Sequence, residues 1–270
     1  MNSTALRWIQ PDWPAPAHVH ALTTERSASR PNDPYDGFNF ADYVKDAPVK
    51  VATHREVLHK TLGFLDPPMW LSQQHGNTVL GLDHRCETRV ADGSFTNRDR
   101  TVCAVLSADC APVFLSDREG TFVALLHVGW RGLAVGVLEA GIAAVSSTAQ
   151  EMICWVGPAI SQEYFEVGND VRHQLIENNP ADESHVALSG EHYFADLPGL
   201  ILARLRRIGV AYVAASTECT YAKAGRWFSY RRQGLCGRMA SLIWIVGWRA
   251  LLAQNCIRSL PARKTGLALG

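Results

Sequence analysis

Residues 121–132 read TFVALLHVGWRG, an aliphatic run that ends in a histidine, two glycines and an arginine. The aliphatic residues 121–126 predict a buried strand, and the polar residues lie where that strand stops. A single histidine at a strand end is more often a hydrogen-bonded core residue than a ligand. Gly129 and Gly132 change that balance, because glycines relax the backbone and let another group approach the main chain. His127 is therefore a candidate ligand or catalyst.

Two further residues are candidates to share a metal with His127. Cys110 lies in ADCAPVFL, at the entrance of another apolar strand, and His75 lies in QQHG, a polar interruption between apolar elements. Alone, such a cysteine is more often a small core residue, and His75 is the weakest of the three. Two imidazoles and one thiol together suit a zinc ion with three protein ligands and an open fourth position, as in catalytic zinc sites. The sequence thus predicts a metalloenzyme.

Other polar residues near these motifs have weaker interpretations. Arg131 and Arg238 are candidate contacts for an anion, because a guanidinium binds phosphate or carboxylate through paired hydrogen bonds; an exposed surface arginine is the alternative for each. Asp92, in ADGS, is interpreted as a turn former. The run RWFSYRR (226–232) is expected to form a strand whose aromatic residues belong to the core and its rim rather than to a base-stacking platform.

Composition disfavours several classes of partner. The 270 residues include 26 Lys and Arg and 26 Asp and Glu, so there is no basic field to hold a nucleic acid. No apolar run reaches the roughly 18 residues of a spanning helix, and the N-terminal residues do not resemble a signal peptide. Seven cysteines, an odd number without a CxxC pair, fit a reducing compartment. We expect a cytoplasmic monomer with no nucleic-acid or membrane partner.

Hydrophobic periodicity mixes helices and strands without a regular βαβ rhythm. We expect helices at 49–64, 133–147, 164–178 and 197–209, and strands at 18–24, 69–72, 77–82, 101–107, 112–117, 121–127, 152–160, 210–216, 226–232 and 239–247. Several strand pairs look like hairpins, which favours a mixed sheet layered with helices over a doubly wound fold. Residues 1–246 are interpreted as one catalytic domain, and 247–270 as a C-terminal appendage without assigned function.

Eight motifs occur in a fixed order along the chain: QQHG, SADCAPVFLSD, HVGWRG, VGPAIS, YFEVGNDV, ECTY, FSYRR and GRMASLIW. On these motifs the chain resembles the YfiH-like family, also called the peptidoglycan editing factor or polyphenol oxidase (laccase-domain) family. The resemblance runs from IQPDWPAP at 9–16 to SLIWI at 241–245. Two loops depart from the family: Ser27-Ala28 replaces a usual Gly-Gly, and Val44-Lys45-Asp46 replaces a Val-Gly-Asp.

The resemblance implies a fold and a site. The fold is α+β with four α/β/β/α layers, similar to that of cytotoxic-necrotizing-factor-like cysteine hydrolases. The zinc ligands, which are also the catalytic residues, fall on His75, Cys110 and His127, with copper as the alternative ion.

The resemblance also implies an activity, the phosphorolysis of adenosine, inosine, guanosine and methylthioadenosine, with deamination of adenosine. The partners are then a purine nucleoside and phosphate. Three alternatives stay open. One is a hydrolase that edits peptidoglycan precursors with Cys110 as nucleophile and His127 as base. Another is a copper-dependent polyphenol oxidase, although a multicopper enzyme needs repeated HxH pairs and the chain has only His18-Val19-His20. The third is a non-catalytic partner of cell-wall synthesis.

Overall fold

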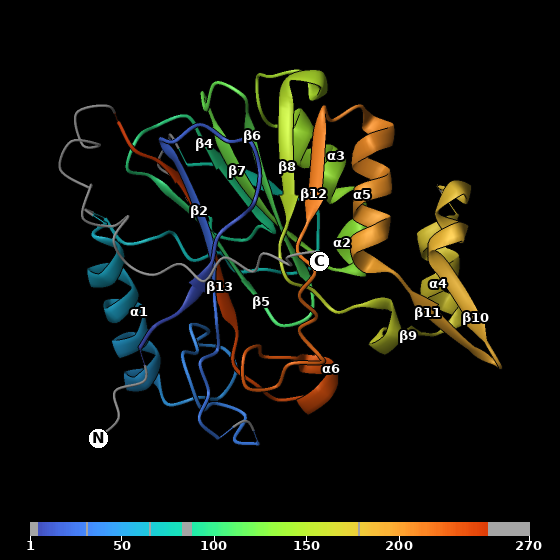
Figure 1. Cartoon of the computed structure of the whole chain (residues 1–270), viewed down its shortest axis with the longest axis horizontal. Coiled ribbons are helices and arrows are strands. Elements are labelled where there is room, and N and C mark those ends of the chain that lie inside the picture. Colours follow the sequence, from blue (N-terminus) through green and yellow to red (C-terminus); the bar gives the residue numbers. More distant parts are fainter. Residues whose placement is uncertain (1–4, 31, 65, 83–87, 178, 248–270) are drawn as a thin grey trace, which may run out of the picture.

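Two β-sheets packed face to face form the centre of the protein, with helices on both outer faces (Figure 1). The structure is a computed structural model that describes residues 5–30, 32–64, 66–82, 88–177 and 179–247. All but the first residue of the predicted appendage, 247–270, lie outside these ranges, so the appendage and the single-domain boundary stay predictions. None of the described helices is both long enough and apolar enough to cross a membrane.

The first sheet is antiparallel and has four strands. In spatial order they are β1 (Trp8–Ile9), β2 (Val19–Thr24), β13 (Met239–Ile245) and β5 (Val102–Ser107). Alternate residues of β13 face opposite ways, as the two-residue period of a strand requires. Leu242 and Trp244 pack toward the helix α1 (Pro48–Leu62), whereas Ile243 and Ile245 pack toward the second sheet.

The second sheet is mixed and has six strands. In spatial order they are β12 (Tyr212–Ala215), β8 (Met152–Val156), β6 (Ala111–Asp117), β7 (Val123–Val128), β4 (Gly93–Thr96) and β3 (Val79–Gly81). Every residue of β6, β7 and β8 is buried, because one face meets the first sheet and the other meets helices. The predicted hairpin turn at 117–120 joins β6 to β7.

Helices cover the outer face of the second sheet. They are α2 (Trp130–Ala134), α3 (Val137–Ala143), α4 (Asn169–Ile176) and α5 (Leu197–Ile208), beside a small sheet of β10 (Val186–Ser189), β11 (His192–Ala195) and β9 (Glu166–Val167). With α1 on the opposite side, the order of layers is helix, sheet, sheet, helix (Figure 1). The four-layer α+β architecture implied by the family resemblance is thus confirmed.

Several expected elements differ from the structure. The helix expected at 133–147 begins earlier and breaks into α2 and α3 at Gly136, whose φ of 86° is left-handed. The helix expected at 164–178 begins at Asn169, and the strand expected at 69–72 forms only isolated bridges. The short strand β4 went unpredicted, because the glycine and serine of ADGS indicate a turn.

The strand expected at 226–232 is wrong. Trp227 and Phe228 are fully buried, and the chain then turns into the short helix α6 (Tyr230–Gln233). The hydroxyl of Ser229 caps this helix by accepting from the amide of Arg232 at 3.2 Å. The segment is therefore a turn into a helix and not a strand. The expected division into core and rim is still found, since Trp227 and Phe228 are buried and Tyr230 is exposed.

Both loops that depart from the family contain a non-glycine residue with left-handed backbone. Ser27 has a φ of 55° and Lys45 a φ of 67°. An L-residue in this region clashes with its own carbonyl, and glycine does not. Because Lys45 is exposed, we expect Lys45→Gly to raise the free energy of unfolding by about 0.5–1 kcal/mol. Denaturant unfolding of the two proteins measures this. A lower midpoint for the glycine variant would contradict the prediction.

Candidate metal and catalytic site

The three predicted ligands meet at one end of the second sheet. Cys110 directly precedes β6 and His127 is near the end of β7, and the pairing of Ala111 with Val128 in the antiparallel ladder brings these ends together. His75 comes from the loop before β3. One potential ligand atom from each of the three lies within 4.8 Å of the others. His127 is buried, Cys110 half-buried and His75 exposed, so the group opens to solvent on one side.

Gly129 makes this close approach of side chains feasible. A Cβ atom at this position would lie 2.8 Å from Cys110 Sγ and 3.1 Å from His75 Cδ2. Any side chain there would push two of the three ligands apart. The glycine after the strand, which the sequence marked only as permissive backbone, is therefore required by packing.

Asp92, which the sequence suggested only as a turn former, is the residue that holds two of the candidate ligands in place. Asp92 is 1% exposed, and its carboxylate accepts four hydrogen bonds. Oδ1 accepts from His127 Nδ1 and from the amide of His75, both at 2.9 Å, and Oδ2 accepts from the amides of Gln74 at 3.0 Å and Gly76 at 2.7 Å. One carboxylate thus fixes the ring of one ligand and the loop that carries another, and it leaves only Nε2 of His127 for a metal.

The site holds a thiolate beside a protonated imidazole in the metal-free state. Burial favours the neutral thiol, but the charge and hydrogen bond of His127, and then those of His75, outweigh it and lower the pKa of Cys110 from 9.0 to about 6. Burial likewise opposes the charged form of His127, but Cys110 and Asp92 raise its pKa from 6.5 to about 9. Hydrogen bonds from His127 and the loop amides lower the pKa of Asp92 against its burial. A cysteine with this pKa is expected to react as a thiolate near neutral pH.

The low pKa of Cys110 predicts a pH profile for alkylation. In chelator-treated protein, the iodoacetamide rate at Cys110 is expected to rise as the pH increases through about 6, because the thiolate forms there rather than near 9. Mass spectrometry of the modified peptide measures it. Cys154 and Cys236 are internal controls, since burial raises the pKa of both thiols. A midpoint for Cys110 above pH 8 would refute the ion pair.

Asp109 fixes the backbone before Cys110. It has a φ of 92°, and its buried carboxylate accepts from Thr220 Oγ1 at 2.7 Å, from Ser229 Oγ at 3.0 Å and from the amide of Arg231 at 2.7 Å. These bonds tie the start of β6 to α6. The segment predicted as a strand therefore lies beside the site as a capped helical turn.

The two arginines predicted as anion contacts belong to different segments outside the ligand group. Arg131 is exposed on α2, and its guanidinium carbon lies 4.3 Å from the centroid of the Trp130 ring. Arg238 precedes β13, and its Nη1 donates to the carbonyl oxygens of Cys236 at 2.7 Å and Gly237 at 3.0 Å. Arg131 lies two residues after Gly129 on α2, and the anion-binding role of both arginines stays a prediction.

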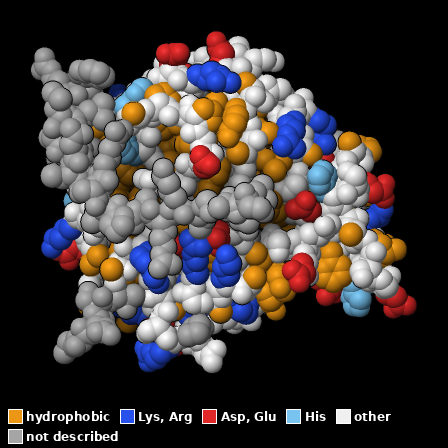
Figure 2. Space-filling view, in the orientation of Figure 1, with side chains coloured by type: hydrophobic (Ala, Val, Ile, Leu, Met, Phe, Trp, Pro, Cys, Tyr) orange, Lys and Arg blue, Asp and Glu red, His pale blue; other side chains and the backbone are white. Residues whose placement is uncertain are grey.

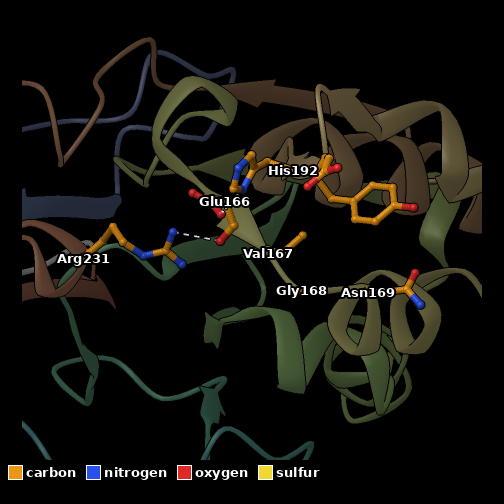
Figure 3. Close-up of a pocket in the computed structure, with 8 residues that line it drawn as sticks. Glu166, Val167, Gly168, Asn169, His192 and Arg231 are labelled. Carbon is orange, nitrogen blue, oxygen red and sulfur yellow. Dashed lines mark hydrogen bonds and ion pairs between the residues drawn. The ribbon is translucent and has the colours of Figure 1, made fainter.

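A separate cavity of about 470 Å³ lies between the small sheet and the start of α4 (Figure 3). None of the predicted site residues lines it. Arg231 reaches its edge, where Nη1 donates to the carbonyl oxygen of Glu166 at 2.8 Å, and Glu166 also pairs with His192 at 2.7 Å. Within this lining, the side chains of Glu166 and His192 are therefore engaged with each other.

Comparison with known sequences supplies the relatives of this chain. A family described as "Multi-copper polyphenol oxidoreductase laccase" matches residues 20–246. "Purine nucleoside phosphorylase YfiH" of Escherichia coli (strain K12) is 38% identical over 239 residues, which cover 88% of this chain and 98% of the relative. "Purine nucleoside phosphorylase PA4543" of Pseudomonas aeruginosa is 39% identical over 240 residues, with the same coverage.

Solved structures show the same fold. The crystal structure of Neisseria meningitidis protein NMB0706 superposes with a TM-score of 0.82 at 40% sequence identity, and the match covers 89% of this chain and 99% of that one. Bacillus licheniformis YfiH superposes with a TM-score of 0.75 at 24% identity over 84% of this chain and 92% of that one, which shows the fold alone.

Proposed function

Because this chain belongs to the multi-copper polyphenol oxidoreductase laccase family, in which relatives carry the name purine nucleoside phosphorylase, we propose that it is a zinc-dependent purine nucleoside phosphorylase. Its substrates are adenosine, inosine, guanosine and methylthioadenosine with inorganic phosphate, and it also deaminates adenosine. The observation that carries the proposal is the His75, Cys110 and His127 group, together with the relatives' names.

The donor set of the group fits zinc. With a pKa of about 6 the Cys110 thiol is a thiolate, the ligating form, near neutral pH, and zinc binding would release the proton that His127, with a pKa of about 9, holds in the metal-free protein. Asp92 on Nδ1 of His127 is the carboxylate that ligating histidines usually have. A zinc ion at this position would supply a Lewis acid. Copper remains the alternative ion, since imidazole and thiolate bind both metals.

The family description does not extend to a multicopper arrangement in this chain. Among the residues that the structure describes, His75, Cys110 and His127 are the one group of three potential ligands. The HxH pair of the sequence is engaged elsewhere, with His18 Nε2 at 3.3 Å from the carbonyl oxygen of Gly120 and His20 stacked on Trp244. A single three-ligand group fits a mononuclear site.

Phosphorolysis breaks the bond between C1′ of the ribose and N9 of the base, forms a bond from C1′ to a phosphate oxygen, and leaves a proton on the base. The protein's own part is to bind and orient the two reactants. Arg131, exposed beside Gly129, is the proposed phosphate contact because its guanidinium matches the oxygens of the anion. Asp92 keeps His127 fixed while substrates bind.

The state of the cysteines bears on where the protein works. The described cysteines are thiols, which supports a reducing compartment, and we propose a cytoplasmic monomer whose partners are the nucleoside and phosphate. Acidic and basic side chains are interspersed over the face in Figure 2, with a small basic group in the lower half of the view.

The thiolate–imidazolium pair favours a second candidate, a cysteine hydrolase that acts on an amide bond of a peptidoglycan precursor. Cys110 would be its nucleophile and His127 its base. This activity needs a free thiolate, whereas a zinc enzyme needs the same thiolate as a ligand. Chelation and alkylation therefore separate the two candidates.

Product analysis with inosine and adenosine tests the proposed phosphorylase and deaminase activities. With phosphate present, the zinc-loaded protein is expected to convert inosine to hypoxanthine and ribose 1-phosphate, and without phosphate to release no base. Chelation is expected to abolish both this reaction and the slower deamination of adenosine. Chromatography of the products measures all three results. Activity that survives chelation and is lost only on alkylation of Cys110 would establish the hydrolase instead.

A further inference from the structure

Two exposed tyrosines, Tyr43 and Tyr230, lie close to Arg238. Tyr43 is 56% exposed and Tyr230 is 60% exposed. The guanidinium carbon of Arg238 lies 5.8 Å from the centroid of the Tyr230 ring. Tyr43 follows closely on Phe40, whose amide donates to the carbonyl oxygen of Arg238 at 3.2 Å. Aromatic and guanidinium planes therefore meet on one patch of surface.

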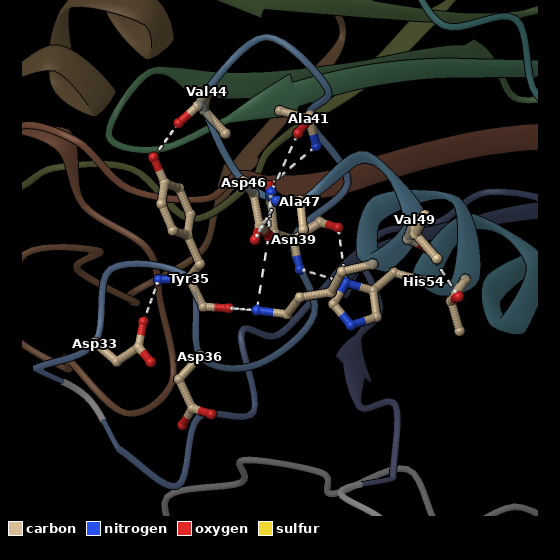
Figure 4. Close-up of polar contacts among 12 residues, drawn as sticks. Asp33, Tyr35, Asp36, Asn39, Ala41, Val44, Asp46, Ala47, Val49 and His54 are labelled. Atoms are coloured by element: carbon tan, nitrogen blue, oxygen red, sulfur yellow. Dashed lines mark hydrogen bonds and ion pairs between the residues drawn. The ribbon is translucent and has the colours of Figure 1, made fainter.

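The patch is held rigidly at Arg238. Its Nη1 is fixed by two carbonyl oxygens, and its own amide donates to Oδ1 of Asn39 at 2.9 Å. Asn39 is fully buried, and its Nδ2 also donates to the carbonyl oxygen of Ala41 at 3.1 Å and to Asp46 Oδ2 at 3.0 Å (Figure 4). The hydroxyl of Tyr35 donates to the carbonyl oxygen of Val44. The loop that carries Tyr43 is thus anchored on both sides of it.

The patch lies next to the candidate metal centre. Tyr230 begins α6, where the amide of Arg231 and the hydroxyl of Ser229 donate to Asp109, the residue before Cys110. The groups that shift the pKa of Tyr43 also place it near both Arg238 and Cys110. Partial desolvation raises the pKa of its phenol, Arg238 opposes the rise, and the negative charges of Asp42 and Cys110 add to it.

From this placement we propose that Tyr43, Tyr230 and Arg238 form the subsite that binds the purine base of the nucleoside by stacking. The proposal rests on the proposed nucleoside activity. Purine bases stack on aromatic rings and on guanidinium planes. A purine base stacked on the Tyr43 or Tyr230 ring would lie beside the candidate metal ligands, and its ribose would point toward the metal centre.

Steady-state kinetics of the zinc-loaded protein test the subsite. Tyr43→Ala and Tyr230→Ala are each expected to raise the KM for inosine on the order of tenfold and to leave the KM for phosphate unchanged, because stacking on one ring is lost. Tyr43→Phe and Tyr230→Phe keep the ring and are expected to keep the wild-type KM. Leu188→Ala is the control for truncation of an exposed side chain, since Leu188 is 63% exposed on β10, at the far edge of the molecule (Figure 1).

Three results would overturn the subsite, and a fourth would support it even if the nucleoside activity fails. Unchanged KM for inosine in both alanine variants, with turnover intact, refutes the subsite and leaves the phosphorylase in place. If the wild type turns over no nucleoside, saturation-transfer NMR with hypoxanthine decides. Binding that is lost in both alanine variants supports a base site independent of that activity, and equal binding in them, or none in the wild type, refutes it.

Discussion

Replacing His127 with alanine or Cys110 with serine is expected to remove zinc from the protein and to abolish nucleoside turnover. The wild type, stripped and reloaded, is expected to hold about one zinc per chain, because the group offers one set of three ligands. Loss of a partner that only orients a ligand costs about 10–100-fold in metal affinity. Loss of a ligand itself is therefore expected to cost more than about 100-fold. Elemental analysis after dialysis, with competition against a chelating dye, measures both quantities.

Cys154→Ala is the matched control for the cysteine variant. Cys154 is a fully buried thiol on β8 whose pKa is raised by burial, so its loss is expected to cost stability and to leave the zinc content unchanged. Thermal unfolding of all variants separates loss of metal from loss of fold. One zinc per chain in the folded Cys110→Ser protein would show that the metal site is assigned wrongly.

Asp92→Asn is expected to give the second large effect, a fall in zinc affinity of about 10–100-fold in a protein that still folds. Both oxygens of the Asp92 carboxylate accept from N–H donors. An asparagine has only one oxygen, so its NH2 group would face N–H donors that it cannot bind. The charge that raises the pKa of His127 and fixes its ring is lost as well. Zinc competition measures the affinity, and absorption of the cobalt-substituted protein reports the ligand geometry.

Asp117→Asn is the control for this variant. Asp117 is also a buried carboxylate and accepts from the amide and hydroxyl of Thr121, but it lies at the opposite end of β6 from Cys110. The two substitutions are expected to cost similar stability, about 1–3 kcal/mol, whereas only Asp92→Asn lowers the zinc affinity. Equal zinc affinity in both variants would reduce Asp92 to a structural residue.

The layers of the fold were predictable because their strands are buried and short. The aliphatic runs that became β5, β6, β7 and β8 are buried on both faces, so hydrophobicity alone marks them. The secondary structure was predicted wrongly where polar contacts between distant residues outweigh the local hydrophobic pattern. RWFSYRR contains a strand-like alternation, yet Ser229 caps a helical turn there and Asp109 binds that turn from far along the chain.

The sequence by itself determined the burial of the central strands and the three candidate ligands, since histidine and cysteine at strand ends and in a loop carry their chemistry with them. Only the tertiary structure decided the role of Asp92 and the patch around Arg238. Asp92 lies 17 residues from His75 and 35 from His127, and Asn39 lies 199 residues from Arg238. Such hydrogen bonds depend on which strand ends and loops the packed sheets bring together. The neighbouring residues in the sequence do not indicate these long-range contacts.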